Sequence, residues 1–442
     1  MPFLSRQRRL LIAAATVPAV QLLAGAFLPA RAAEAALSSA DNTLLLISAA
    51  MVLLMTPGLA FFYGGFVQGR NVLNTMAMSF VMMGIATLVW ASFGFSLAFA
   101  DGGAAQAVVG NPFTFALLER LPEVWDGLAV PGLTFALFQG MFAIITPALI
   151  SGALVERISF RFWCLFTPIW LLLVYSPLAH MVWGGGVLGK DLDFAGGTVV
   201  HISSGVTALV LAGLIGARRQ WPKAVRPPHD VTQILLGTGL LWFGWFGFNG
   251  GSQLAVGGAE IPFTTTHVAA AAGLVAWSLM ETWRDGKPTA VGMATGAVAG
   301  LVAITPAAGY VSPLGALVIG FAAAFLCSWA LQLKNRSRLD DSLDVLPVHG
   351  VAGLLGILLT GVLALSSVNP AGANGLLAGN PAQLLIQIKA AGFTALWVGV
   401  GTFVILQALR MVMPLRASDA EERQGLDINA HGEEAYNTEF TM

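Results

Sequence analysis

Two histidines lie inside long apolar stretches of the sequence, and each follows an aspartate by eight residues: His201 follows Asp193, and His349 follows Asp341. In an apolar, membrane-like setting an ionisable side chain indicates a functional site, because its removal from water is costly. Burial favours the neutral imidazole, which both donates and accepts a hydrogen bond. The pair therefore predicts a passage for a small polar solute, although each histidine could instead simply bond a neighbouring helix.

Aromatic side chains and one hydroxyl gather near the predicted outer ends of several apolar stretches. Aromatic faces attract small cations, most strongly where water is excluded, and a hydroxyl adds an acceptor. Any one of these rings would also serve as packing or as a membrane-interface anchor, so only their combination with the two imidazoles points to a site for a small cation. The residues are Phe138, Phe142, Trp183, Trp245, Phe248 and Ser252.

Other kinds of site find little support. The sequence has no acidic ring, no carbonyl filter motif and no arginine clamp of the kind that ion channels use. A membrane enzyme that used the histidines and an aspartate as metal ligands would need local spacing such as His-Glu-x-x-His, whereas the acids lie helical turns away from the imidazoles. We therefore expect no metal, no cofactor and no enzymatic activity.

The composition is that of a polytopic, all-α membrane protein. Of 442 residues, 56% are hydrophobic and only 10% are charged, whereas a soluble domain averages about 25% charged residues. The net charge of −1 and the lack of a basic run give no indication of a nucleic-acid partner. Cys164 and Cys327 are too few and too far apart for a disulfide framework. The 51 glycines predict helices that pack closely.

The first 33 residues predict a secretory signal peptide that is removed from the mature protein. They combine a basic start, an apolar middle and the small-residue pattern Ala30-Arg31-Ala32. An uncleaved first helix is the alternative. Residues 34–415 would then form one transmembrane domain, followed by a polar, acidic tail at 416–442.

Eleven later segments are long and apolar enough to span a bilayer, which takes about 20 residues. Loops on one side, together with the tail, hold fifteen Lys and Arg residues, and loops on the other side hold only Arg120 and Lys190. Because positive loops stay in the cytoplasm, the mature N-terminus is expected outside and the C-terminus inside. The segments lie near 42–66, 73–99, 131–155, 160–182, 196–217, 230–250, 262–284, 289–307, 311–333, 345–365 and 383–413.

Short echoes between the two halves predict an internal repeat. GLAFFYGG at 58–65 resembles GWFGFNGG at 244–251, ITPA occurs at 145–148 and again at 304–307, and the aspartate-to-histidine spacing recurs. The repeats, about 41–220 and 229–366, hold five spans each, so they must have opposite topology, with helix 11 (about 383–413) outside them. Inverted repeats place the transport site at their interface near the membrane midplane. His201 and His349 should therefore face each other.

The sequence resembles the ammonium transporter (Amt/Mep/Rh) family, bacterial Amt branch, in seven motifs: TPGLAFFYGGFVQGRNVLN, FQGMFAIITPALISGALVER, AHMVWGGG, LDFAGGTVVHI, WFGFNGGS, ITPAAGY and VHGVAG. The similarity runs from about residue 41 to the tail motif GLDINAHGEEAYN and so covers the whole predicted mature chain. The resemblance implies an eleven-helix protomer with pseudo-two-fold halves, a homotrimer, and one pore through each subunit.

The resemblance also implies roles for the outer aromatic residues. By matching motif, Phe142, Trp183 and Ser252 would form an external site that recruits ammonium, and Phe142 with Phe248 would form a stacked gate below it. Phe138 would lie close to the entrance and line the pore. The presence of Trp183 and Ser252 favours the Amt branch over the Rhesus branch and its ammonia or carbon dioxide channels.

Deeper in the pore, the resemblance implies that His201 and His349 form a twin-histidine pair, with Trp245 lining the pore nearby. Asp193 would support the site from the start of its helix, where a negative charge is favoured and where it could also simply cap exposed amides. His267 departs from the family pattern, and a helix-packing contact near the outer surface is its favoured interpretation.

The implied activity is transport of ammonium, ammonia and methylammonium across the bacterial inner (cytoplasmic) membrane, with the N-terminus periplasmic. Ammonium would dock at the aromatic cage and lose its proton, and neutral ammonia would pass the histidines; the proton either returns outside or crosses separately. The lipid bilayer and a PII-type regulatory protein at the cytoplasmic face are further expected partners, and the tail is expected to couple subunits. An ammonium sensor with little transport is the alternative.

Overall fold

The computed structural model describes residues 37–219, 221–222 and 227–436, and all of these except Leu37 belong to one unit that begins at Ser38. The predicted signal peptide lies outside the described residues. Within the described part the chain is helical, and its only β-type pairing is an isolated bridge between Ile158 and Arg416. The all-α architecture predicted from the composition is therefore confirmed.

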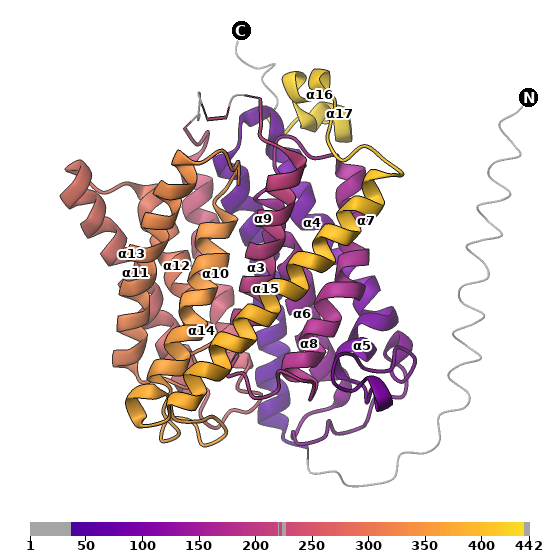
Figure 1. Ribbon diagram of the computed structural model, residues 1–442, viewed down its shortest axis with the longest axis vertical. Helices are drawn as coiled ribbons and strands as arrows, with labels where there is room; N and C mark the ends of the chain where they lie inside the picture. Colours follow the sequence, from indigo (N-terminus) through magenta and orange to yellow (C-terminus); the bar gives the residue numbers. More distant parts are fainter. Residues whose placement is uncertain (1–36, 220, 223–226, 437–442) are drawn as a thin grey trace, which may run out of the picture. The chain divides into compact units, whose positions relative to one another are not determined.

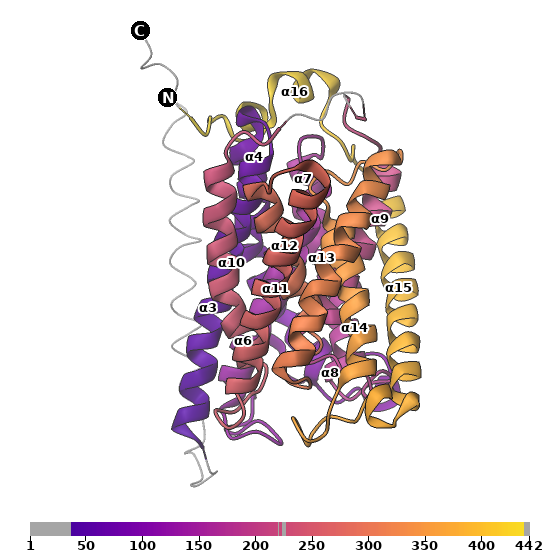
Figure 2. The ribbon, with the colours of Figure 1, turned by 90° about the vertical axis from the view of Figure 1, so that its left-hand side faces the viewer.

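Eleven helical segments follow the eleven predicted spans (Figures 1 and 2). Ten of them are long and apolar enough to cross a membrane, and α12 is shorter, with 15 residues. In chain order the segments are α3 (Ser39–Phe66); η2 (Gly69–Asn71), α4 (Val72–Val89), η3 (Trp90–Gly94) and α5 (Phe95–Phe99); α6 (Gly132–Ser151); α7 (Phe160–Trp170), η6 (Leu171–Tyr175) and α8 (Ser176–Trp183); η7 (Gly197–Ile202) and α9 (Ser203–Ile215); α10 (Val231–Gly251); α11 (Glu260–Asp285); α12 (Ala290–Ile304); α13 (Pro313–Arg336); η8 (Leu346–Val351) and α14 (Ala352–Leu363); and α15 (Pro381–Arg410).

Short helices lie outside these segments, namely η4 (Gly103–Ala105), η5 (Ala116–Leu118), η9 (Leu376–Ala378), α16 (Asp419–Gln424) and α17 (Leu426–His431). Polar side chains mark where several long helices begin. Ser38 accepts a hydrogen bond from the Asp41 amide, and Asp230 accepts from the amides of Thr232 and Gln233. Such caps satisfy amides that have no partner inside the helix.

The first helices of the two predicted repeats, α3 and α10, run antiparallel and pack along their length (Figure 2). The amide of Asp230, at the start of α10, donates to the carbonyl of Gly65 at the end of α3. At the opposite ends, the Val256 amide donates to Asp41. The crossing is close, because a Cβ on Gly58 would come within 2.9 Å of the Leu240 side chain. These two equivalent helices therefore run in opposite directions, as an inverted repeat requires.

The fifth segments of the two halves also lie against each other. A Cβ added at Gly205, in α9, would collide with the backbone of Gly350 in η8, and one added at Gly353 would lie 2.8 Å from the Cβ of His201. Backbones can approach this closely only where side chains are absent. These two glycine positions let the histidine-bearing segments meet at the centre of the unit.

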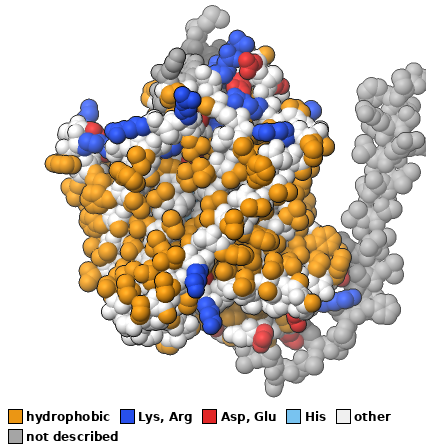
Figure 3. Space-filling model, viewed as in Figure 1, with side chains coloured by type: hydrophobic (Ala, Val, Ile, Leu, Met, Phe, Trp, Pro, Cys, Tyr) orange, Lys and Arg blue, Asp and Glu red, His pale blue; other side chains and the backbone are white. Residues whose placement is uncertain are grey.

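The surface carries a broad apolar belt, with lysine and arginine concentrated at the end where α16 lies (Figure 3). Large exposed side chains such as Leu88, Trp329 and Leu396, which are 73%, 59% and 66% exposed, contribute to the apolar surface. The long helix α15 runs obliquely along α9 and α14 (Figure 1). A belt of this kind is expected where a protein faces lipid rather than water.

Candidate functional site

A cavity of about 290 Å³ opens at the end of the unit opposite the tail, and the predicted recruitment residues lie in its wall. Phe142 comes from α6, Trp183 ends α8, and Ser252 follows α10 directly. The rings of Phe142 and Trp183 meet edge to face, with centroids 6.0 Å apart and planes at 81°. The Ser252 hydroxyl donates to the Phe248 carbonyl at 2.8 Å, so its lone pairs remain available as acceptors.

Below this cavity, Phe142 and Phe248 form a close pair. Their ring centroids lie 4.3 Å apart with an angle of 33° between the planes, and both residues are 1% exposed. Phe138 packs edge-on against Phe142, with centroids 5.1 Å apart. Phe138 is fully buried and is not among the residues that line the outer cavity. The tilted pair therefore closes the floor of the cavity, and Phe138 packs against Phe142.

The two histidines meet beneath the phenylalanine pair. Nδ1 of His349 lies 3.3 Å from Nδ1 of His201, and the rings are nearly parallel, with centroids 5.4 Å apart. The prediction that they face each other is confirmed. At this distance one Nδ1 donates its hydrogen to the other, so the neutral pair shares one hydrogen bond. Nε2 of His201 has no partner among the described residues.

The space beside the histidines is small and apolar. A void of about 10 Å³ is lined by both imidazoles, Trp245, Phe248, Phe62 and other apolar side chains. That volume is close to the minimum that a single water molecule needs. Trp245 stacks on His201 at 5.6 Å, and its indole N–H donates to Thr305 at 2.9 Å. The geometry suits a small uncharged solute that passes in single file.

Each histidine is carried by a π-helical turn, His201 by η7 and His349 by η8. Such turns are rare and often occur at functional sites. An aspartate accepts amide hydrogen bonds at the start of each turn: Asp193 from four amides between Gly196 and Val199, and Asp341 from the amides of Val345 and Leu346. The recurring spacing in the sequence thus corresponds to a recurring local structure.

Asp193 is 4% exposed and lies in the wall of the outer cavity. Burial raises the pKa of its carboxyl group, while hydrogen bonds from Thr198, Val199 and Gly196 act in the opposite direction. Its backbone carbonyl accepts the indole N–H of Trp183 at 2.9 Å. Asp193 therefore both caps its turn and fixes the ring at the cavity mouth.

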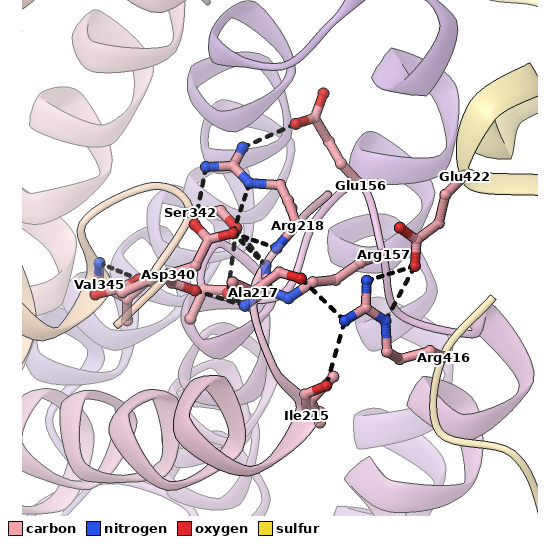
Figure 4. Close-up of polar contacts among 12 residues, drawn as sticks. Glu156, Arg157, Ile215, Ala217, Arg218, Asp340, Ser342, Val345, Arg416 and Glu422 are labelled. Atoms are coloured by element: carbon pink, nitrogen blue, oxygen red, sulfur yellow. Dashed lines mark hydrogen bonds and ion pairs between the residues drawn. The ribbon is translucent and has the colours of Figure 1, made fainter. Parts of the chain in front are cut away.

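A second large cavity, of about 380 Å³, lies at the tail end and is lined by many charged side chains. There Arg218 forms ion pairs with Glu156 at 2.8 Å and with Asp340 at 2.9 Å (Figure 4). Burial would raise the pKa of Asp340, but the hydrogen bond from Arg218 and the charges of Arg157 and Arg218 hold it below its usual value. These contacts join the two predicted repeats at the tail end of the unit.

The tail is attached to the same region. Arg416 pairs with Glu422 at 2.7 Å and donates to the Ala217 carbonyl at 3.0 Å (Figure 4). Asp427 accepts from the amides of Leu73 and Asn74 at the start of α4. The tail through Tyr436 is therefore an ordered part of the fold.

His267 lies apart from the other histidines. It is exposed on α11, and its ring packs near Trp242 and Phe246 of α10, with centroids 5.4 Å and 6.0 Å away. These contacts agree with a helix-packing role. Within the described residues there is no group of three or more His, Cys, Asp or Glu side chains that could hold a metal ion.

Sequence reasoning missed three buried polar residues. Asp191 lines the outer cavity beside Asp193, and Thr305 orients Trp245. His180 is fully buried, and its ring nitrogens lie 3.0 Å and 2.9 Å from the carbonyls of Ala98 and Gln106. The acid two residues before Asp193 was a signal that could have been used, whereas the threonine and the histidine contacts depend on tertiary packing.

Comparison with known proteins agrees with this geometry. The Ammonium Transporter Family profile matches residues 43–436. An ammonium transporter of Bacillus subtilis (strain 168) is 44% identical over 412 residues, with 90% of this chain and 98% of that protein covered. The crystal structure of Saccharomyces cerevisiae Mep2 is similar with a TM-score of 0.83 and 32% identity, covering 92% of this chain and 94% of that one. A structure described as a "Sensor Amt Protein" gives a TM-score of 0.81 and 28% identity, covering 89% and 98%.

Proposed function

The chain belongs to the Ammonium Transporter Family, and on that premise we propose that it carries ammonium across a bacterial cytoplasmic membrane. The observation that carries the proposal is the pair of imidazoles in contact beneath a closed aromatic pair, with Nδ1 atoms 3.3 Å apart. A dry constriction of this kind admits a neutral molecule and opposes an ion.

Recruitment takes place in the outer cavity. Trp183 and Phe142 offer aromatic faces and edges, Ser252 offers an acceptor, and the acids of the wall favour a cation. A cation over an aromatic face gains about 0.5–2 kcal/mol, most where water is excluded. This supports binding of ammonium or methylammonium before the proton is lost.

The charge penalty explains why a proton must be lost. An ion at the centre of a bilayer costs about 2.5 kcal/mol on insertion scales and more than 10 in simulations. Neutral ammonia avoids that cost, and it can donate to and accept from neutral imidazoles. The proton left behind either returns to the outside, which gives an electroneutral channel, or crosses by a separate route, which gives electrogenic transport.

The setting in the membrane belongs to the same proposal. Residues 1–33 are a cleaved signal peptide, the mature N-terminus is periplasmic, and the tail at 416–442 is cytoplasmic. The protein is a homotrimer with one pore in each subunit, and the tail couples the subunits. A PII-type protein regulates it by binding at the charged cavity of the tail end. The concentration of lysine and arginine at that end supports this orientation (Figure 3).

The test is transport by the purified protein in liposomes, measured as current on a solid-supported membrane and as internal pH by stopped flow. His201→Ala is expected to reduce ammonium flux at least about tenfold, since it removes a hydrogen-bonding partner from the dry path. His267→Ala, at an exposed position, serves as the matched control. Flux that His201→Ala leaves unchanged would refute the role of the histidine pair.

The same assays separate the mechanisms. A sustained, saturable current requires net charge movement and a proton route, whereas a pH change without current supports an electroneutral channel. The likeness to a sensor Amt protein favours a second candidate, an ammonium sensor with little transport. If neither assay gave a signal while ammonium binding was retained, that alternative would be established.

A further inference from the structure

Two carboxyl groups lie together in the wall of the outer cavity. Asp191 is 8% exposed and Asp193 is 4% exposed, and both line the cavity with Trp183 and Ser252. Within the described residues, no lysine or arginine forms an ion pair with either acid. Two buried, unpaired negative charges so close together are costly, so the pair favours holding a proton.

The hydroxyl group of Thr198 joins the two acids. Its oxygen lies 2.7 Å from Oδ2 of Asp191 and 2.5 Å from Oδ2 of Asp193. A hydroxyl has only one hydrogen to donate. If both acids were ionised, one of these contacts would bring two acceptors together with no hydrogen between them. One carboxyl group must therefore carry a proton that it donates to Thr198.

The hydrogen bonds around the acids identify which one is protonated. Asp193 accepts from four backbone amides, between Gly196 and Val199, and such contacts stabilise an ionised carboxylate. Asp191 has no such set, and its Oδ1 has no hydrogen-bond partner among the described residues. The proton therefore lies on Asp191, which donates to Thr198, and Thr198 in turn donates to Asp193.

The surroundings of Asp191 agree with this assignment. Burial, and after it the charge of Asp193, raises the pKa of Asp191 well above its usual value, against smaller opposing effects of Thr198 and Gln387. Tyr310 is the other titratable group that lines the cavity wall, and both acids act on its ionisation. Lys190 precedes Asp191 in the chain and is exposed.

We propose that Asp191 is a proton-exchange site of the outer cavity, linked through Thr198 to Asp193. In the forward step Asp191 gives its proton to the Thr198 oxygen while Thr198 gives its own hydroxyl proton to Asp193. Asp191 is then a carboxylate, and Asp193 is an acid. An N–H bond of ammonium in the cavity can then break, its proton forming an O–H bond on the carboxylate of Asp191, and ammonia remains. Asp193 then releases its proton to water in the cavity, which restores the starting state. The steps from ammonium onward rest on the proposed transport function; the shared proton does not.

The shared proton is tested by infrared spectroscopy of the full-length protein in lipid, titrated between about pH 5 and 9. Ordinary carboxyl groups are mostly ionised in that range, so a neutral one stands out. The parent is expected to keep a protonated-carboxyl C=O band at neutral pH, and Asp191→Asn is expected to lose one such band. Asp126→Asn, at an exposed position, should leave it intact. An unchanged band in Asp191→Asn would overturn the proposal. If Asp191→Asn does not fold, Thr198→Val is measured instead. The carboxyl C=O band should then shift, and an unshifted band would overturn the proposal.

Transport supplies the second readout. Asp191→Asn should lose one ionisation from the pH profile of the initial methylammonium flux, and Asp191→Glu should restore it. A parental pH profile in Asp191→Asn would overturn the proton-exchange role while leaving transport established. Absence of transport in the parent, with the infrared band present, would instead refute the proposed function and leave the shared proton in place.

Discussion

At the scale of single residues, Trp183 is held at one edge of its indole ring. Its N–H donates to the Asp193 carbonyl, and the Phe142 ring meets it at 81°. The residue ends α8, so a rigid helix sets its position and a hydrogen bond sets its rotation. A ring fixed in this way pays little entropy when a cation binds beside it.

Trp183→Leu should therefore weaken recruitment rather than the step at the histidines. Loss of about 0.5–2 kcal/mol of cation–π attraction corresponds to a half-saturation concentration about 2- to 30-fold higher for methylammonium. Uptake into liposomes over a range of concentrations measures it. Trp283→Leu, at a residue that is 91% exposed, is the matched control. If Trp183→Leu had the same half-saturation concentration as the parent, the indole would not be part of the proposed recruitment site.

The sequence predicted some of these residues and not others, for physical reasons. His201 and His349 stood out because ionisable groups are rare in apolar stretches. Arg157 was counted among the cytoplasmic loop charges, yet it is fully buried, where it donates to the carbonyl of Asp340 and to Ser342. Hydropathy and charge counts report where the chain leaves the membrane, but they cannot report which loop charge finds a buried partner.

At the scale of helices, the spans were predictable because about 20 apolar residues are needed to cross a bilayer. Their internal construction was not. The predicted span 73–99 consists of α4, η3 and α5 joined end to end, and 160–182 of α7, η6 and α8. A π-helical turn leaves the hydropathy of the segment unchanged, so only the three-dimensional structure reveals it. The predicted span 289–307 ends earlier, at Ile304, just before Pro306.

The cap of η8 gives a prediction on pH. Burial, and after it the charge of Asp344, raises the pKa of Asp341 to about 6, against the opposing charge of Lys334. The unfolded value is about 3.9, so between about pH 4 and 6 the unfolded chain binds fewer protons than the folded one. The contribution of Asp341 to the free energy of unfolding is fully present below pH 4. It is lost as the pH rises to 6, and the loss amounts to about 3 kcal/mol.

In Asp341→Asn, the free energy of unfolding should not show this fall between pH 4 and 6. Thermal unfolding in detergent, followed from pH 4 to 7, should show a parental stability that falls relative to Asp341→Asn as the pH rises. Asp285→Asn, an exposed acid in a surface ion pair, provides the control for general charge effects. Parallel pH profiles of the parent and Asp341→Asn would show that the cap does not titrate in this range.

At the scale of the whole unit, the tail connects parts of the fold that are far apart in sequence. Arg416 holds Glu422 and the end of α9, and Asp427 accepts from the start of α4. The cluster around Arg218 lies beside it and joins the two halves (Figure 4). A change at the tail therefore reaches both repeats through short, polar contacts.

Glu422→Ala should release the tail. Hydrogen bonds to charged groups are worth about 1.5–3 kcal/mol, less here because Arg416 is 29% exposed, so the detached fraction should rise about 5- to 30-fold. Limited proteolysis, read as the loss of a C-terminal epitope, measures that fraction. Glu433→Ala, an exposed acid in the same tail, is the control. Equal cleavage rates would show that the Arg416 contact does not hold the tail.

The π-helical turns η7 and η8 make the pore sensitive to chain length as well as to residue type. Each turn holds one more residue than α-helical winding would, and each histidine follows its capping aspartate by eight residues. After an in-frame deletion of one residue between the aspartate and the histidine, the two side chains could not both keep their positions. Either the cap keeps its amides and the imidazole swings about 100° around the helix, or the imidazole stays and the carboxylate is pulled from its partners. A single insertion or deletion in either turn therefore dismantles the site.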